Sequence, residues 1–354
     1  MASELQVNTI TEATSGSGIT FAKDIIPATP LSHRNMVING AMGIWQRGTS
    51  QVSVGNTPIF RADRWEARAG VTGGTVDAVS DTPTTSDTKF PYALKFTVGG
   101  SAGSISASTA TNYFNYKMEG QDFYHAKWGT AQAKPITLSF WVKSSVTGDY
   151  GLTFGKDLAQ TYGTKYTISS ANTWEKKTIT VTGPTSGTWQ NDNNVSLRIL
   201  WNWGAGSNYT TSTLNTWASS DYRGGYDGGS AVQLVANANA TWYITGVQLE
   251  LGTVATPFEH RSYGEELARC ERYCQKIGLI TPTKARETDR ARACDVNFKT
   301  TMRANCTVPS IQTTDSMALT ISGQSPDGFH GYYTASSDGM AAGVPVGTIV
   351  TAEL

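Results

Sequence analysis

One run, Thr241 to Cys270 (TWYITGVQLELGTVATPFEHRSYGEELARC), constrains the fold of this chain more than any other segment. Its first part, Trp242 to Leu251, is rich in aromatic and branched residues and ends at a glycine, which predicts a β-strand and then a turn. Pro257 favours extended backbone before it, and the acidic pair Glu265-Glu266 favours a helix N-terminus. The run therefore predicts the last strand of a β-sandwich, an extended strap, and the start of a helix.

The composition suits an all-β protein with many turns, because only 16% of the 354 residues are charged and 36 are glycine. The 28 basic and 28 acidic residues cancel, and they form no basic cluster, so we expect no nucleic-acid partner. No apolar run approaches the roughly 20 residues of a membrane span, so we expect no membrane insertion. The polar start Met1–Glu4 lacks the features of a signal peptide, which favours synthesis in a cytoplasm.

Strand candidates separated by turn residues predict one antiparallel sandwich over residues 35–261. They are Val37–Ile38, Tyr92–Val98, Ile136–Lys143, Tyr166–Ser169, Lys177–Val181, Val195–Trp201 and Trp242–Leu251. Residues 262–278 are expected to hold a linking helix, from about Glu265 to Lys276, with Leu267, Cys270, Cys274 and Ile277 on one stripe. A small β-domain is expected over residues 279–354, with strands at Ala293–Phe298, Met317–Ile321, Tyr332–Thr334 and Thr348–Thr351.

The first 34 residues contain two short alternating segments around a Ser/Gly turn, with apolar positions at Leu5, Val7, Ile10, Ile19 and Phe21. Two strands this short do not stay folded alone, whereas three copies around a common axis would cover one another's apolar faces. We therefore expect an oligomerisation segment. The alternative is a flexible leader in which two prolines mark a linker.

Four cysteines lie in the last quarter of the chain, at positions 270, 274, 294 and 306. A zinc site is the alternative reading, but the spacing matches no usual motif and no histidine lies close in sequence. We expect thiols that pack in a protein folded in a reducing compartment.

Several blocks occur in a fixed order along the chain: NMVINGAMGIWQRG at 35–48, FRADRW at 60–65, ITLSFWVK at 136–143, WEKKTITV at 174–181, the run 241–270, VNFKTTMRANCTVP at 296–309 and TAEL at 351–354. As an ordered set they resemble tail-fibre and other virion appendage proteins of tailed phages, marine and cyanophage ones especially. The resemblance implies a jelly roll similar to carbohydrate-binding modules, opened by the first two blocks and closed by Val247–Glu250. It also implies an N-terminal attachment or trimerisation segment and a small C-terminal β-domain.

The sequence carries no recognisable catalytic motif, because its four histidines are scattered and it has no nucleophile elbow, zincin helix or phosphate-binding glycine loop. A glycosidase needs only two facing carboxylates, which sequence cannot pair. We expect no enzyme.

Two acidic positions have a structural and a functional interpretation. Asp63 and Arg64 are interpreted as a salt pair that holds a strand, with a surface contact by Asp63 as the alternative. Glu250 is interpreted as a solvated acid at a strand end, with a structural calcium ligand as the alternative. We expect no other cofactor.

The strongest candidate binding surface is the aromatic loop at 201–226, WNWGAGSNYTTSTLNTWASSDYRGGY. Rings that can stack on sugars alternate there with small polar residues, and charged side chains accompany them. The candidates for glycan contact or for a subunit interface are Trp201, Trp203, Tyr209, Trp217, Asp221, Tyr222, Arg223 and Tyr226. The alternative is that these rings pin the loop to the sandwich.

The hypothesis from sequence is a homotrimeric phage virion protein, a fibre or fibre-like appendage that binds other virion proteins through its N-terminal segment. Its outer part would face a host-surface glycan. One alternative is a capsid decoration or head-fibre protein. A second is a carbohydrate-binding module or depolymerase.

Overall fold

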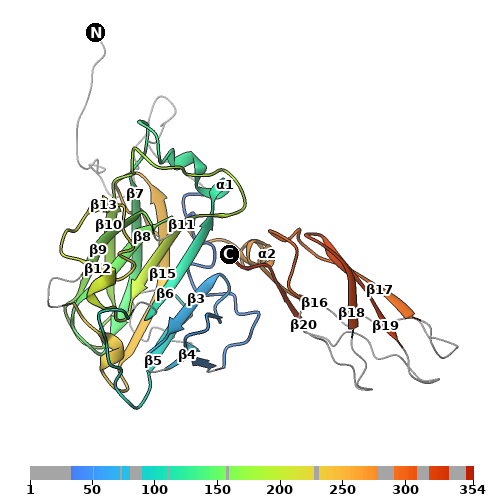
Figure 1. Ribbon diagram of the computed structural model, residues 1–354, viewed down its shortest axis with the longest axis horizontal. Coiled ribbons are helices and arrows are strands. Elements are labelled where there is room, and N and C mark those ends of the chain that lie inside the picture. The colour runs from blue at the N-terminus through green and yellow to red at the C-terminus, as the bar shows by residue number, and fades with distance from the viewer. Residues whose placement is uncertain are drawn as a thin grey trace, which may run out of the picture.

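The computed structural model describes residues 33–50, 52–71, 74–79, 90–109, 112–156, 159–226, 231–277, 291–308, 319–334 and 348–354. Two antiparallel sheets face each other and form the sandwich (Figure 1). The first sheet has the spatial order β1 (Val52–Val54), β4 (Gly74–Val79), β5 (Ala93–Val98), β15 (Thr241–Leu251), β7 (Ile136–Ser144) and β10 (Glu175–Val181). The second has the order β13 (Thr216–Ala218), β9 (Thr161–Ile168), β8 (Gly148–Gly155), β11 (Val195–Asn202), β6 (Asn112–Glu119), β3 (Trp65–Ala69) and β2 (Ile59–Phe60). The all-β jelly-roll sandwich predicted from sequence is confirmed.

Shorter elements lie in the connections of the sandwich. They are α1 (Gly120–Phe123), η1 (Tyr124–Ala126), η2 (Ser207–Tyr209), β12 (Thr210–Thr211), β14 (Gly225–Tyr226) and η3 (Leu234–Ala236). Across the described residues, no helix is long and apolar enough to cross a membrane.

Aromatic side chains fill the space between the two sheets. Along each strand, alternate residues point inward, so Phe96 on β5 and Phe114 on β6 meet rings from other strands. Phe96 stacks on Trp203 at 3.8 Å between ring centroids, and Trp65 stacks on Phe114 at 4.9 Å. Large rings bury much apolar area per residue, which gives this sandwich a thick and strongly stabilised core.

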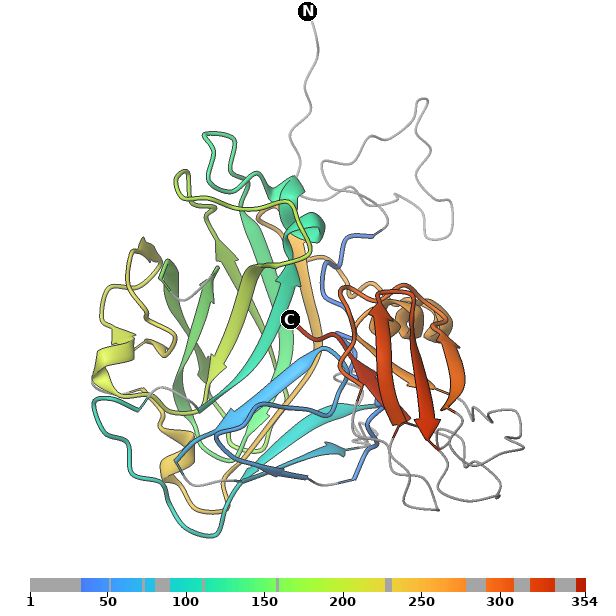
Figure 2. The same cartoon turned by 45° about the vertical axis from the view of Figure 1, so that its right-hand side comes forward.

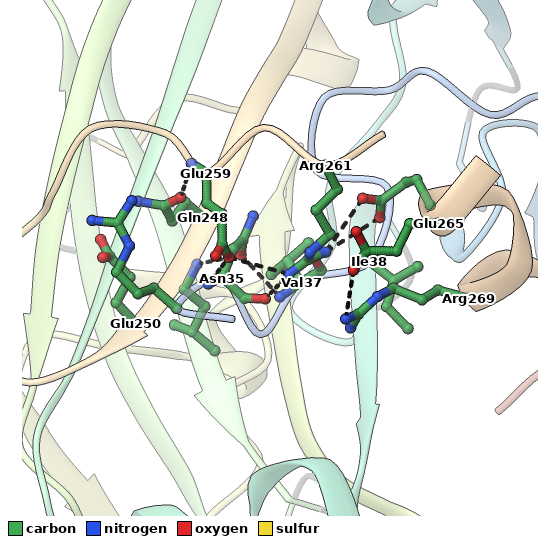
Figure 3. A network of polar contacts seen from close by, with 12 residues as sticks. Asn35, Val37, Ile38, Gln248, Glu250, Glu259, Arg261, Glu265 and Arg269 are labelled. Carbon is green, nitrogen blue, oxygen red and sulfur yellow. Dashed lines mark hydrogen bonds and ion pairs between the residues drawn. The ribbon is translucent and has the colours of Figure 1, made fainter. Parts of the chain in front are cut away.

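The strap after β15 holds the first described segment against the sandwich (Figure 3). Asn35 donates its backbone N–H to the Glu259 carboxylate at 2.8 Å, and Glu259 donates its own N–H to the Gln248 side chain at 2.7 Å. Arg261 donates to the carbonyl of Val37 at 3.0 Å and pairs with Glu266 at 3.3 Å. The strap predicted from sequence is therefore present, and it joins segments more than 200 residues apart.

The helix after the strap is shorter than predicted. α2 (Tyr263–Glu271) begins at the N-cap Ser262, whose hydroxyl accepts the N–H of Glu265, and ends before β16 (Cys274–Ile277). Residues 274–277 pair with β20 (Thr348–Thr351) and are not helical, so the expected single stripe through Cys270 and Cys274 is wrong. Both residues are free and buried, as is Cys306, while the side chain of Cys294 lies outside the described residues.

The C-terminal unit lies to one side of the sandwich and consists of the β16–β20 pair and a three-stranded sheet (Figures 1 and 2). That sheet has the order β17 (Ala291–Asn297), β19 (Gly328–Thr334) and β18 (Leu319–Ser325). Its described core is small and consists of Ile277, Val296, Met302, Cys306, Phe329, Val350 and Ala352. A core of this size gives little independent stability, so contacts with the sandwich matter.

A buried arginine joins the two parts. The Arg64 guanidinium lies 3.4 Å from the Tyr273 ring centroid and pairs with Glu353 at 3.0 Å. Arg47 also reaches Glu353, at 2.7 Å, and the Lys117 ammonium donates to the carbonyl of Leu354 at 2.6 Å. We call this group the C-terminal clamp. Charged pairs removed from water in this way hold a fixed geometry between the parts.

The sequence prediction that Asp63 and Arg64 pair with each other is corrected. Asp63 is fully buried and accepts hydrogen bonds from the Gln46 backbone and side chain, and its nearest cation is Arg47 at 3.7 Å. Arg64 instead faces Glu353. Burial raises the pKa of Asp63 to about 6, against the opposing effect of Arg47. The structural role of both residues stands, but with different partners.

Candidate functional site

The first two rings of the aromatic loop belong to the core of the sandwich. Trp201 and Trp203 have no exposed area, because they continue the inward-facing positions of β11 after Ile199. Trp201 packs edge-on against Phe140 at 5.6 Å. Neither indole can stack on a ligand or on a neighbouring subunit, so this part of the sequence prediction is corrected.

Trp217 pins the loop to the sandwich. It lies 5.2 Å from Trp128 and 5.9 Å from Trp189, and its indole N–H donates to the Thr182 carbonyl at 2.7 Å. On β13 it also meets Tyr162 of β9, at 5.5 Å. These contacts match the alternative interpretation, in which the rings hold a long loop in place.

Glycines let the rest of the loop run close over the outer face of the second sheet. A Cβ at Gly151 would lie 2.0 Å from the Gly224 carbonyl oxygen, so only glycine fits there. The Thr153 hydroxyl donates to the Tyr222 carbonyl at 2.8 Å, and Asn202 donates to the Gly224 carbonyl at 2.7 Å. The backbone of Tyr222 is thus hydrogen-bonded to the outer face of the sheet, which holds the loop in place.

Polar side chains cover the outer face of the same sheet beside this loop. Strand register places Glu66 opposite Asn115 and Arg68 opposite Tyr113, all pointing away from the core. The Glu66 carboxylate accepts the Asn115 amide at 3.1 Å and pairs with the Lys117 ammonium at 2.8 Å. We define the polar strip as Glu66, Arg68, Tyr113, Asn115, Lys117, Arg198, Arg223 and Tyr209.

Two polar atoms of the strip have no hydrogen-bond partner within the described part of the chain. They are Oδ1 of Asn115 and Nε of Arg198, and both are buried. Arg198 lies opposite Lys117 in the register of β11 and β6. Asn115 has no exposed area, so its unpartnered oxygen lies beneath the surface of the strip.

The loop contributes charged and aromatic groups at the edge of the strip. The Arg223 guanidinium pairs with the Asp221 carboxylate and lies 5.1 Å from the Tyr209 ring centroid. Burial raises the pKa of Tyr113, with the Glu66 charge acting in the same direction, so its phenol remains a hydrogen-bond donor at neutral pH. The partly exposed groups at this edge are the Tyr209 ring, the Arg223 guanidinium and the Asp221 carboxylate, whereas Glu66, Tyr113 and Asn115 are buried.

Tyr226 lies beside the strip in a separate contact. The Lys165 ammonium lies 4.5 Å from its ring centroid and also pairs with Asp149 at 2.6 Å. Of the sequence candidates, the structure thus brings Tyr209, Asp221, Arg223 and Tyr226 to the surface of the sheet. It does not bring Trp201, Trp203 or Trp217 there.

The remaining candidate residues have the following positions. Glu250 is buried and accepts hydrogen bonds from the backbone and hydroxyl of Thr256, which corrects its interpretation as a solvated acid. The described residues contain no group of three or more His, Cys, Asp or Glu side chains that could hold a metal ion. The oligomerisation candidates Leu5, Val7, Ile10, Ile19 and Phe21 lie outside the described residues.

Comparisons with known proteins give distant similarities only. No family model and no curated protein matches this chain. Among solved structures, it is similar to the enzymatically active domain of bacteriophage CBA120 tailspike protein 4, with 13% identity over 61% of this chain and 21% of that chain and a TM-score of 0.30. A putative sugar-binding protein from Bacteroides thetaiotaomicron is 10% identical over 62% of this chain and all of that chain, with a TM-score of 0.33. A CBM61 module solved with β-1,4-galactotriose has 11% identity, coverage of 62% and 99%, and a TM-score of 0.28.

The matched part of this chain spans about a fifth of the tailspike domain's length. At these identities and TM-scores the similarities assign no function, and the fold is established by the two sheets themselves.

Proposed function

We propose that this chain is a structural protein of a phage virion, a fibre or fibre-like appendage, and that it binds host-surface glycan through the polar strip. The observation that carries the glycan part is the edge of the strip, where the Arg223–Asp221 pair lies beside the Tyr209 ring. Sugars present hydroxyl groups and flat C–H faces, and a rigid sheet surface with rings and both signs of charge complements them. The ordered sequence blocks, which resemble those of virion appendage proteins, support the virion part.

A glycan array with the full chain tests the binding. We expect Tyr209→Ala and Arg223→Gln each to weaken binding of the best glycan about tenfold, the effect of losing one stacking or charged hydrogen-bonding contact. The matched control is Lys176→Gln, an exposed substitution on β10 of the opposite sheet. Binding that is unchanged in both strip variants would exclude the strip as the site.

The virion part has its own tests. Light scattering is expected to give a trimer for the full chain and a monomer after removal of residues 1–30. Antibodies raised against the chain are expected to label appendages on the phage particles that contain it. Labelling of the capsid surface would favour a decoration protein instead, and labelling of no particle would reject the virion assignment.

We propose that the chain binds the glycan without cleaving it. Prolonged incubation of the chain with its best array glycan is expected to release no reducing ends. Release that is lost in Glu66→Gln would instead favour the depolymerase alternative.

A further inference from the structure

A second site lies where five segments of the chain surround a hollow of about 670 Å³. Its walls are the opening segment 35–49, the turn 90–92, the strap 258–261, α2, and Lys276 with Lys299 of the C-terminal unit. We call it the junction hollow. Its volume is within the usual range for small-molecule sites.

Exposed rings gather at this hollow. The described residues include four exposed large hydrophobic side chains, and two of them, Tyr92 (38% exposed) and Tyr263 (68% exposed), line it. Trp45 also lines it and is partly exposed, while its indole N–H is bound to the carbonyl of Met42 at 2.5 Å. Exposed rings that converge on a concavity are typical of a binding site, whereas rings scattered over a surface are not.

The walls of the hollow are held rigid by the strap network (Figure 3). Arg261 lies between Glu259 at 3.6 Å and Glu266 at 3.3 Å and also donates to the Val37 carbonyl. Phe90 packs edge-on against Phe258 at 4.8 Å, beside Gly246, where a Cβ would lie 2.4 Å from the Phe90 ring. A site whose walls are fixed before binding loses little conformational entropy when it binds a ligand.

The charges of the hollow are divided between its two ends. Arg261 serves two carboxylates, so that end carries an excess of acceptors. At the other end Lys299 lies 3.5 Å from Glu271, while the Lys276 side chain is exposed and its ammonium has no partner within the described part of the chain. The lysine end can therefore receive an anionic group, and the carboxylate end can accept hydroxyl protons.

We propose that the junction hollow binds an acidic saccharide, with a ring face on Tyr92 and Tyr263 and its carboxylate at Lys276. The inference rests on the proposed function for the saccharide class, but it concerns different residues. The alternative occupant is an acidic peptide, which shares the anionic group but not the hydroxyl-rich ring.

Titration calorimetry of the full chain tests this with three probes: tetragalacturonate, its full methyl ester and tetraglutamate. The ester keeps the sugar rings and removes the charge, and the peptide keeps the charge and removes the rings. We expect the acidic saccharide to bind about tenfold more tightly than the other two probes, the scale of one charge-assisted contact. Equal binding of acid and ester, tighter binding of the peptide, or no binding of the acid at millimolar concentration would overturn the proposal.

Variants assign the binding to the hollow. Lys276→Gln is expected to reduce the affinity for the acid to that for the ester, and Tyr263→Ala to weaken both saccharides. Both residues are exposed, so thermal unfolding should be unchanged and loss of binding cannot arise from misfolding. The control Lys176→Gln should bind normally.

The same titrations separate this proposal from the polar strip. Tyr209→Ala is expected to leave tetragalacturonate binding unchanged, and Lys276→Gln to leave the array glycan unchanged. Loss of tetragalacturonate binding in Tyr209→Ala but not in Lys276→Gln would reject the hollow and retain the strip.

Discussion

The sandwich and the C-terminal unit are both β-structures, but they are stabilised in different ways. Inside the sandwich, rings from both sheets pack on one another without exposed area, as Trp65, Phe96 and Trp242 do. The C-terminal unit has a small core, and charged contacts attach it to the sandwich through Arg64 and Glu353. The sandwich therefore folds on its own core, whereas the C-terminal unit depends on its attachment to the sandwich.

The largest expected effect is in the sandwich core. Trp242→Ala removes a fully buried indole that packs on Phe114 and Trp203 and donates to the Tyr166 hydroxyl at 3.0 Å. We expect a loss of about 3–5 kcal/mol in the free energy of unfolding, measured by denaturant titration. The C-terminal unit should unfold in the same transition. If it melted separately and unchanged, the dependence inferred above would be wrong.

The second effect is at the clamp. Arg64→Ala leaves Glu353 with Arg47 as its remaining cation and empties the space beside the Tyr273 ring. We expect a cost of about 3 kcal/mol, because one partner of a buried charged pair is lost. Calorimetry should then show two transitions, with the C-terminal unit melting first. Arg269→Ala, on the solvent side of α2, serves as the control and should keep one transition.

The third effect is a pH dependence at the buried Asp63. Its folded pKa of about 6 lies above its ordinary value, so the folded state binds this proton more tightly than the unfolded state does. The contribution to stability is therefore full below about pH 4 and is lost as the pH rises through 6. The change should be on the order of 2 kcal/mol and absent in Asp63→Asn. If the wild type and Asp63→Asn showed the same change in stability over this pH interval, the prediction would be contradicted.

The smallest effect is at the start of α2. Ser262→Ala removes the hydroxyl that accepts the Glu265 N–H at 3.2 Å and should cost about 1 kcal/mol. Ser262→Asp restores an acceptor and should recover most of that stability. Denaturant titration of the two variants checks this, and a loss in Ser262→Ala that Ser262→Asp does not recover would contradict the capping role.

The sequence predicted those strands in which branched and aromatic residues alternate with polar ones. Strands β5, β7, β10, β11 and β15 lie where they were expected. It missed β6, NYFNYKME, because its outward positions carry amides and charges that belong to the polar strip. It also missed β8, whose glycines accommodate the loop that crosses over it.

Other differences arise from contacts between distant segments. Val37–Ile38 forms no strand, because the backbone turns at Asn39, with φ of 58°, to place Gly40 against Val247. Residues 274–277 leave the helical pattern because β20 provides a partner strand. Trp201 and Trp203 could have been assigned to the core from sequence, since they continue the alternation of Leu197 and Ile199. The junction hollow gave no local signal, because its walls come from five separate segments.

The hydrogen bond between Asn35 and β15 has a consequence for folding during translation. Asn35 bonds the Val247 carbonyl over a separation of 212 residues, and β15 is a central strand between β5 and β7. The first sheet therefore stays incomplete until residue 251 has been synthesised. At ordinary elongation rates this is roughly 10–40 s after the synthesis of Asn35. During that interval β5 pairs only with β4 and β7 only with β10, so each has one unpaired edge and the nascent chain is most prone to aggregate before β15 is made.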